Sequence, residues 1–300
     1  MSTAGDFPDG LEDWWADYAR SLRRRGHGRS EETIKLYRRS YERFWRWADV
    51  TDPADVTTGM VNAWVDDLRI TLAPATVAIY WRSLRPFFSW WAKEVEAPNP
   101  FAGADVPTAK PQDPDVIDLD DIRKLLETCT GRDFADRRDN AIIRVLFDTG
   151  ARRGELINLT VDDWDRRRDY LTLRGKTGTR VVPISPSTGE AMARYVRARG
   201  NHPGGARTDA LWLGGKGSLR DSGISQLLAR RCDMAGLPRI NPHRFRHTFA
   251  HEFKAAGGSE GDLMLLAGWK SSAMAHRYGR SAAAQRARDA HRHLGLGDRL

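Results

Sequence analysis

A proline-rich stretch a third of the way along the chain most constrains the fold. Residues 97–116, APNPFAGADVPTAKPQDPDV, carry five prolines and no apolar periodicity. Proline has no backbone N–H and a fixed φ, so this stretch predicts an extended linker rather than a helix or a strand. We therefore expect two domains, residues 1–105 and 117–300, joined by a linker over residues 106–116, which also suits a length of 300 residues.

The part of the chain before the linker is predicted to be helical throughout. Helices are expected over residues 11–24, 54–70 and 73–94, and over SEETIKLYRRSYERFWRWA, which Ser30 caps. Most of the eleven tryptophans fall at helical spacing near other apolar residues, which predicts that they lie in a core. The sequence thus predicts a small helical bundle.

Basic residues dominate the helix that Ser30 caps and the residues that precede it. Between Arg20 and Ala48 there are ten basic and three acidic residues. Such residues either form a solvated surface or contact a polyanion such as DNA. The candidate DNA contacts are Lys35, Arg38, Arg39, Arg43 and Arg82.

The part after the linker is predicted to be mixed. Helices are expected over residues 118–128, 134–149, 187–199, 221–235, 242–256, 259–267 and 271–280, with a last amphipathic segment over 282–294. YLTLRGKTGTRVVPI, residues 170–184, alternates around a glycine-containing turn and predicts a β-hairpin. The fold class is therefore mainly α with a small β-sheet: an N-terminal helical bundle and an α+β second domain.

Composition excludes several classes of protein. Lys+Arg 48 against Asp+Glu 40 gives a net charge of +8 and a pI of about 9.7, which favours an anionic partner but equally suits simple solubility. Cys129 and Cys232 are too few for a disulfide framework or a metal cluster, although one remote bridge stays open. We find neither a signal-peptide pattern nor an apolar run of membrane length, and expect a cytoplasmic protein.

The segment NPHRFRHTFA, residues 241–250, places two histidines on one helix face. His243 and His247 have the spacing of the zinc motif His-Glu-x-x-His, but Arg244 stands where that motif has glutamate. No third ligand lies nearby, and Arg244 and Arg246 would repel a divalent cation. The segment therefore predicts an anion site and no metal.

Three further stretches are ambiguous when taken singly. In TGARRGELINL, residues 149–159, Gly150 ends a helix and Glu155 is placed to hold the guanidinium of Arg152; a surface arginine pair is the alternative. GKTG, residues 175–178, is no P-loop because Tyr170 stands where the first glycine belongs, which leaves Lys176 at a hairpin tip. Tyr278, nine residues after Trp269, would alone indicate packing.

Together and in order, these residues resemble the tyrosine recombinase family, also called phage-type integrases. TGARRGEL matches the family's TGxRxxEL, GKTGTRVVPI matches its lysine hairpin followed by R-x-V-P, and HRFRH matches HxLRH. AGW followed by Tyr278 matches LGH or LGW followed by tyrosine, with Trp269 where most members have histidine. An indole N–H donates one hydrogen bond but cannot shuttle a proton. The N-terminal half is also similar to the family's core-binding domain.

The resemblance implies a core-binding domain, a catalytic domain of the DNA breaking-rejoining type, and site-specific DNA recombination. The implied catalytic residues are Arg152, Lys176, His243, Arg246, Trp269 and Tyr278, with Glu155 and His247 in support. Tyr278 would form a 3′-phosphotyrosyl intermediate that leads to a Holliday junction, without metal, ATP or another cofactor. The implied partners are duplex recombination sites, a homotetramer and a small excision factor. Phage integration, transfer of a mobile genetic element and chromosome dimer resolution all stay open as the biological role. The segment over 282–294 would dock on a neighbouring subunit or in cis.

Two alternatives stay open from the sequence. A type IB-like topoisomerase uses the same chemistry and reseals its own strand. A DNA-binding protein that kept the fold without catalysis is the other, although every catalytic position is filled here.

Overall fold

The computed structural model describes residues 9–24, 29–109, 115–176, 178–215 and 217–272, together with residues 275, 288, 291, 292, 294 and 295. The chain divides into two compact units, Met1–Pro111 and Gln112–Leu300. The division falls inside residues 106–116, where the sequence predicts a linker. The functions of the two units stay predictions.

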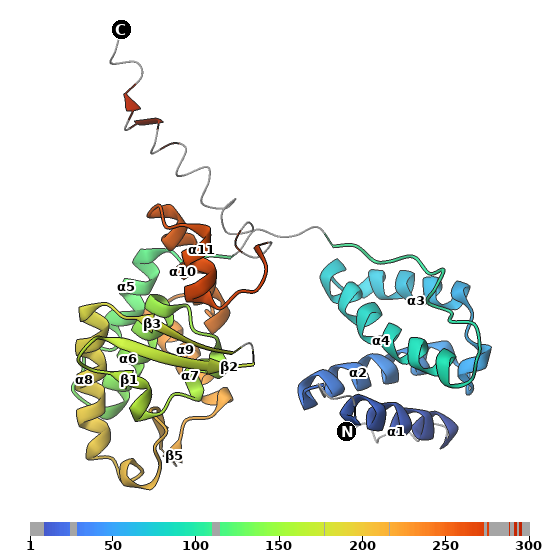
Figure 1. The fold of residues 1–300 in the computed structure, drawn as a ribbon, viewed down its shortest axis with the longest axis horizontal. Helices are drawn as coiled ribbons and strands as arrows, with labels where there is room; N and C mark the ends of the chain where they lie inside the picture. Colours follow the sequence, from blue (N-terminus) through green and yellow to red (C-terminus); the bar gives the residue numbers. More distant parts are fainter. Residues whose placement is uncertain are drawn as a thin grey trace. The chain divides into compact units, whose positions relative to one another are not determined.

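The first unit is a bundle of helices (Figure 1). It contains α1 (Asp9–Arg24), α2 (Glu31–Ala48), α3 (Thr58–Thr71) and α4 (Pro74–Glu94), with a 3-10 turn at Pro53–Asp55. Ser30 caps α2, as predicted, by accepting a hydrogen bond from Thr33 N. The predicted helix over 54–70 begins late because Asp52 caps the 3-10 turn and Thr57 caps α3.

Aromatic side chains fill the core of this bundle. Trp64 and Trp81 are fully buried, and the ring of Phe44 meets that of Trp64 edge-on at 5.2 Å between centroids. Trp45 and Trp91 are buried in the same cluster. Large rings bury much apolar surface per residue, so four short helices suffice for a core.

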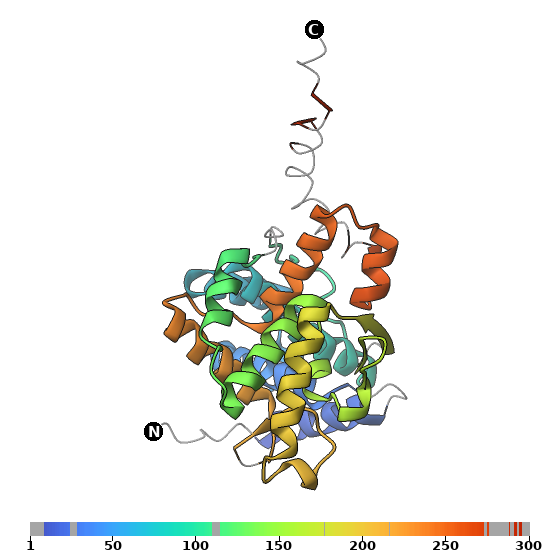
Figure 2. The same ribbon diagram turned by 90° about the vertical axis from the view of Figure 1, so that its left-hand side faces the viewer.

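The second unit combines helices with two small sheets. Its helices are α5 (Leu119–Glu127), α6 (Phe134–Thr149), α7 (Arg153–Ile157), α8 (Pro186–Gly200), α9 (Asp221–Ala235), α10 (Pro242–Ala255) and α11 (Glu260–Ala267), with 3-10 turns at Val161–Asp163 and Gly205–Arg207. Helix α6 packs against α8 and α10, and Figure 2 shows it beside the yellow α8. The helix predicted over 271–280 and the segment over 282–294 lie almost entirely outside the described residues.

The predicted hairpin forms the larger sheet. Strands β1 (Trp164–Asp165), β2 (Tyr170–Gly175) and β3 (Gly178–Pro183) are antiparallel in the order β1-β2-β3, with Gly175 opposite Gly178 at the turn. Leu171 and Leu173 are buried while Tyr170 and Arg174 are exposed, which is the alternation that predicted a strand. The sequence did not predict β1, or the second hairpin of β4 (Leu213–Gly214) and β5 (Gly217–Ser218).

Two further expectations concern cysteines and membranes. Cys129 and Cys232 are both buried free thiols, so the remote bridge that the sequence left open does not form. Burial raises the pKa of each thiol. None of the helices in the described parts of the chain is long and apolar enough to cross a membrane.

A buried ion network joins α6 to α9. The fully buried Asp139 accepts hydrogen bonds from Arg138 at 2.9 and 2.8 Å, from Arg230 at 2.7 Å and from Arg231 at 2.9 Å. Arg231 also donates to Asp136 at 2.7 Å. The carboxylate of Asp139 is thus the common acceptor for three guanidinium groups from two helices.

Asp139→Asn should therefore destabilise the protein strongly. Removing one member of a buried ion pair leaves uncompensated charge and typically costs about 3–5 kcal/mol. Urea unfolding followed by circular dichroism measures the loss. Asp233→Asn is the matched control, because its pair with Arg239 is largely exposed and is worth at most about 1 kcal/mol. An equal shift of the unfolding midpoint in both variants would contradict the assignment.

Candidate active site

The site begins where α6 ends. Gly150 closes the helix with φ of 55°, as its position predicted. A Cβ at Gly150 would lie 2.5 Å from Cδ1 of Phe249, so only glycine fits between α6 and α10. The chain then turns so that Arg152 caps α7, with its backbone N–H donating to Oε2 of Glu155 at 2.8 Å.

Glu155 is a buried carboxylate shared by two arginines. Its Oε1 accepts from Nη1 of Arg152 at 2.7 Å and from Nη1 of Arg180 at 2.6 Å. Burial alone would raise the pKa of Glu155, but the bonds from Arg180 and Arg152 outweigh it and hold that pKa below its ordinary value. Glu155 is therefore an anion that fixes the pose of Arg152, as its spacing predicted.

The carboxyl end of α11 holds three arginines. Arg180 Nε donates to the carbonyl oxygen of Leu266 at 2.6 Å. Arg246 Nη2 donates to that of Ala267 at 2.5 Å, and Arg152 Nη2 to that of Gly268 at 3.0 Å. The last carbonyls of a helix have no partner within the helix and carry partial negative charge. Three guanidinium groups from distant segments are thus anchored on consecutive backbone atoms.

Gly268 permits this close approach. It ends α11 with φ of 64°, and a Cβ there would lie 3.2 Å from Cδ of Arg180 and 3.5 Å from Nη1 of Arg152. The glycine of the AGW motif therefore provides the positive φ of the helix end and leaves Arg180 and Arg152 uncrowded. Trp269 follows directly and is buried against α10 and α11.

Arg246 is the most deeply placed of the three arginines. Its side chain is 3% exposed, and Nη1 donates to the carbonyl oxygen of Gly150 at 2.8 Å. Its guanidinium carbon lies 5.2 Å from the ring centroid of Trp269. Two helix ends, those of α6 and α11, thus fix Arg246, and Trp269 packs on its face.

The two predicted histidines share the first turns of α10. Asn241 caps this helix by accepting from the backbone N–H groups of His243 and Arg244. The ring of His243 is exposed and meets that of the buried His247 edge-on, with 4.3 Å between centroids. His243 therefore faces outward, and the buried ring of His247 packs against its inner side.

A cleft of about 290 Å³ brings several of these residues together. The residues that line it are Ala151, Arg152, Arg153, Asn241, Pro242, His243 and Arg246, and no carboxylate is among these described residues. The neighbouring Arg153 is paired with Asp221 at 2.7 Å, whereas Arg152 is held by Glu155. The cleft offers cationic donors to an anion.

The remaining predicted residues lie in different places. Lys176 is exposed in the turn between β2 and β3, directly after Gly175, which packs against Glu155. Tyr278 lies outside the described residues. No three His, Cys, Asp or Glu side chains gather as metal ligands in the parts of the chain that the structure describes.

Of the candidate DNA contacts in the first unit, Lys35 pairs with Glu32 at 2.8 Å and Arg38 with Glu12 and Glu42 at 2.6 Å each. The other three, Arg39, Arg43 and Arg82, have no carboxylate partner among the described residues. The guanidinium of Arg43 lies over Tyr80, and Arg82 donates to the carbonyl of Ala78.

Sequence reasoning missed Arg180. Its signal was the R-x-V-P pattern itself, because Arg180 occupies an inward position on β3 two residues before the buried Val182. Strand alternation would place both side chains on the same face.

Comparison with known proteins identifies the family. Residues 115–285 match the profile of the phage integrase family. The chain is 31% identical over 263 residues to the tyrosine recombinase XerD of Corynebacterium glutamicum, which covers 81% of this chain and 86% of that protein.

Solved structures share the fold. The Tn1549 transposon integrase in complex with transposon right end DNA has a TM-score of 0.75 at 20% identity, covering 94% of this chain and 99% of that one. A lambda integrase dimer bound to a COC′ core site has a TM-score of 0.71 at 18% identity, covering 89% and 94%. These likenesses confirm the predicted fold class. With the profile match over more than half of its length and a relative of this similarity, the chain belongs to the phage integrase family, the tyrosine recombinases, and is a site-specific recombinase.

Proposed function

We propose that this recombinase cuts and rejoins duplex DNA through a covalent 3′-phosphotyrosyl bond to Tyr278. The observation that carries the proposal is the cleft in which Arg152, His243 and Arg246 meet without a lining carboxylate. Such a cleft suits a phosphodiester, whose charge grows on its non-bridging oxygens as a nucleophile attacks. The DNA-bound relatives of the same fold support the choice of substrate.

The two arginines stabilise the transition state. Arg152 and Arg246 are held by backbone carbonyls and one carboxylate, so their guanidinium groups are in place before the DNA arrives. Donors fixed in advance need no reorganisation when charge develops on the phosphate. Trp269 adds one indole N–H donor and packs against Arg246.

Proton transfers complete the step. Oη of Tyr278 attacks phosphorus, the P–O5′ bond breaks, and His243 takes the phenolic proton. Lys176 gives a proton to the departing 5′ oxygen. A phenol with an ordinary pKa near 10 loses its proton more readily beside cations. Side chains supply the charge stabilisation, so the step as written needs neither metal nor ATP.

Strand exchange follows from the covalent bond. The phosphotyrosyl link conserves the energy of the phosphodiester, so a 5′ hydroxyl of a second duplex can attack it and join the strands. Two such rounds pass through a Holliday junction. This requires two synapsed DNA sites and hence four copies of the enzyme, with the segment over 282–294 available for docking between them; a small excision factor would set direction.

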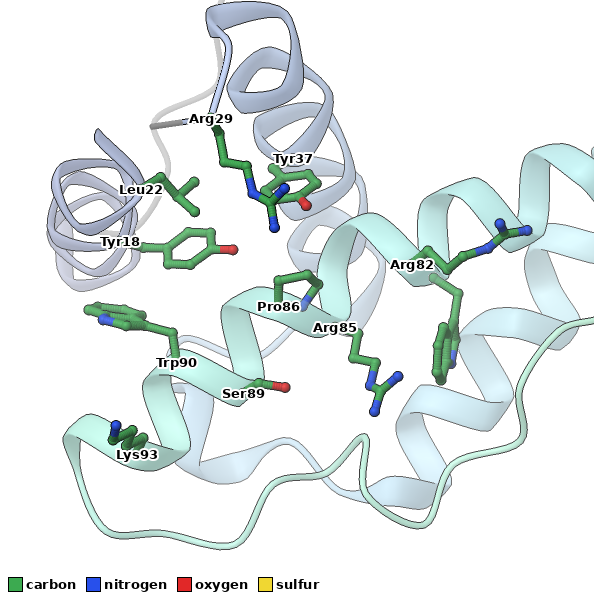
Figure 3. Close-up of a pocket in the computed structure, with 11 residues that line it drawn as sticks. Tyr18, Leu22, Arg29, Tyr37, Arg82, Arg85, Pro86, Ser89, Trp90 and Lys93 are labelled. Carbon is green, nitrogen blue, oxygen red and sulfur yellow. The ribbon is translucent and has the colours of Figure 1, made fainter. Parts of the chain in front are cut away.

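The helical unit carries a second cationic surface (Figure 3). A pocket of about 620 Å³ lies between α1, α2 and α4. Four cations line it, Arg29, Arg82, Arg85 and Lys93, and none has a carboxylate partner within the described part of the chain. Pro86 lies inside α4 at the same place and lacks the N–H of a regular helix bond. These unneutralised cations, with Arg39 and Arg43, are the proposed contacts with DNA phosphates.

Tyr278→Phe should abolish the covalent adduct while leaving DNA binding within about twofold, because only the nucleophilic oxygen is lost. A nicked suicide substrate traps the adduct, which denaturing electrophoresis resolves. Tyr170→Phe, an exposed tyrosine on β2, is the control and should form adduct like the wild type. Adduct at the wild-type level with Tyr278→Phe would remove the nucleophile assignment.

Replacing both Arg82 and Arg85 by alanine should weaken DNA binding and its salt dependence. Each lost phosphate contact lowers the slope of log K against log salt by about 0.9, so the double variant should lose about 2 units of slope. The control removes the same charge through Arg23→Ala and Lys35→Ala, whose carboxylate partners are Glu31 and Glu32. Equal losses of slope in both pairs would mean that net charge, and not this surface, sets binding.

A further inference from the structure

Arg180 is a largely buried arginine that the proposed reaction leaves without a role. It lies on β3 with a side chain that is 10% exposed. Its Nη1 donates to Glu155 and its Nε to the carbonyl of Leu266, both at 2.6 Å. One side chain therefore joins the hairpin, the partner of Arg152 and the end of α11.

We propose that Arg180 is a positioning residue that holds the β2–β3 turn, and with it Lys176, against the phosphate-binding arginines. The inference rests on the proposed function, in which Lys176 protonates the 5′ oxygen. Arg180 itself touches neither the DNA nor a reacting atom in this proposal. It acts by fixing where the lysine stands.

The hairpin meets Glu155 at two points. On β3 the contact is the ion pair of Arg180, and on β2 it is Gly175, where a Cβ would lie 2.8 Å from Cγ and 2.9 Å from Oε1 of Glu155. Lys176 is the next residue after Gly175. Strand β1 pairs with β2 only at Leu171 and Tyr170, at the end of the hairpin away from the turn, so the position of the turn depends on such attachments.

The two attachments differ in strength. The contact at Gly175 is only close packing. Arg180 makes two hydrogen bonds from one rigid guanidinium group, a charge-assisted bond to the carboxylate of Glu155 and a second bond to the carbonyl of Leu266. Losing Arg180 would leave the turn held on one side alone. Lys176, exposed at the tip, would then sample positions away from the 5′ oxygen.

The phosphate clamp, which is the pair of guanidinium groups of Arg152 and Arg246, keeps its own anchors when Arg180 is removed. Arg152 keeps its bonds to Glu155 and to the carbonyl of Gly268, and Arg246 keeps the carbonyls of Gly150 and Ala267. A defect caused by Arg180 should therefore appear in leaving-group protonation and not in phosphate stabilisation. These two functions can be separated chemically.

The separation uses two versions of the nicked suicide substrate, one with the normal 5′ oxygen and one with a bridging 5′ sulfur. A thiol has a pKa of about 8.5, whereas that of water, and similarly of an alcohol, is about 15.7. A thiolate therefore leaves without a proton. Single-turnover cleavage rates with both substrates report how much each variant depends on the general acid.

Arg180→Ala should slow cleavage of the oxygen substrate by about 10²-fold, the usual effect of misplacing a catalytic group by an ångström. With sulfur its rate should return to within about threefold of the wild type. Lys176→Ala should show the same pattern with a loss of about 10²–10⁴-fold on oxygen. Arg152→Ala should cleave both substrates slowly. DNA affinity should be unchanged in Arg180→Ala.

Arg174→Ala is the matched control. Arg174 lies on the same hairpin, two residues before Lys176, and pairs with Asp163, but its side chain is 59% exposed. The Arg174→Ala variant should cleave both substrates at the wild-type rate. Arg180→Lys, which keeps the charge but not the fork that reaches Glu155 and Leu266 together, should show the same selective defect in a milder form, and it serves as the test if Arg180→Ala does not fold.

An equal loss of cleavage rate with the oxygen and the sulfur substrate in Arg180→Ala or Arg180→Lys would overturn the inference. Arg180 would then act through the phosphate clamp or the fold. Failure of sulfur to rescue Lys176→Ala has a different meaning. It would remove the general-acid role of Lys176 from the proposed function, and this inference with it, while the adduct on Tyr278 would be unaffected.

Discussion

The carboxyl end of α11 is the constraint on which the rest of the second unit depends. Three guanidinium groups approach one another there, and their mutual repulsion would drive them apart in the absence of acceptors. Consecutive backbone carbonyls hold them, and Glu155 is the one carboxylate among the described residues that pairs with two of them. Carbonyls attract a cation without neutralising it, so the site keeps the excess positive charge that a phosphate requires.

Two glycines make this arrangement possible. Gly150 and Gly268 end α6 and α11 in the left-handed region, with φ of 55° and 64°. A side chain is strained at either φ, and a Cβ at Gly150 would also clash with Phe249, whereas one at Gly268 would press on Arg180. Each glycine lies within a motif, TGAR or AGW, so the short motifs are explained by the helix ends as much as by the reaction.

The sequence predicted the long helices, the hairpin and the Arg152–Glu155 pair because each depends on local periodicity or on a spacing of a few residues. Two-residue strands such as β1 and β4 have no period to detect, and they form only where the chain folds back on itself. Arg180 was missed for a related reason. Its acceptor Leu266 lies 86 residues further along the chain, so strand alternation indicates the inward face of Arg180 but not the partners that it meets there.

The same limit applies to the basic helix α2, where charge was visible in the sequence and its neutralisation was not. Arg38 looks like a DNA contact, yet Glu12 and Glu42 both reach it, the first from 26 residues away. Arg246 instead donates to two backbone carbonyl oxygens. An arginine between two carboxylates has lost its net attraction for a phosphate, whereas one between two carbonyls retains it. The availability of an arginine for DNA is therefore set by the chemistry of its acceptors, which only the fold determines.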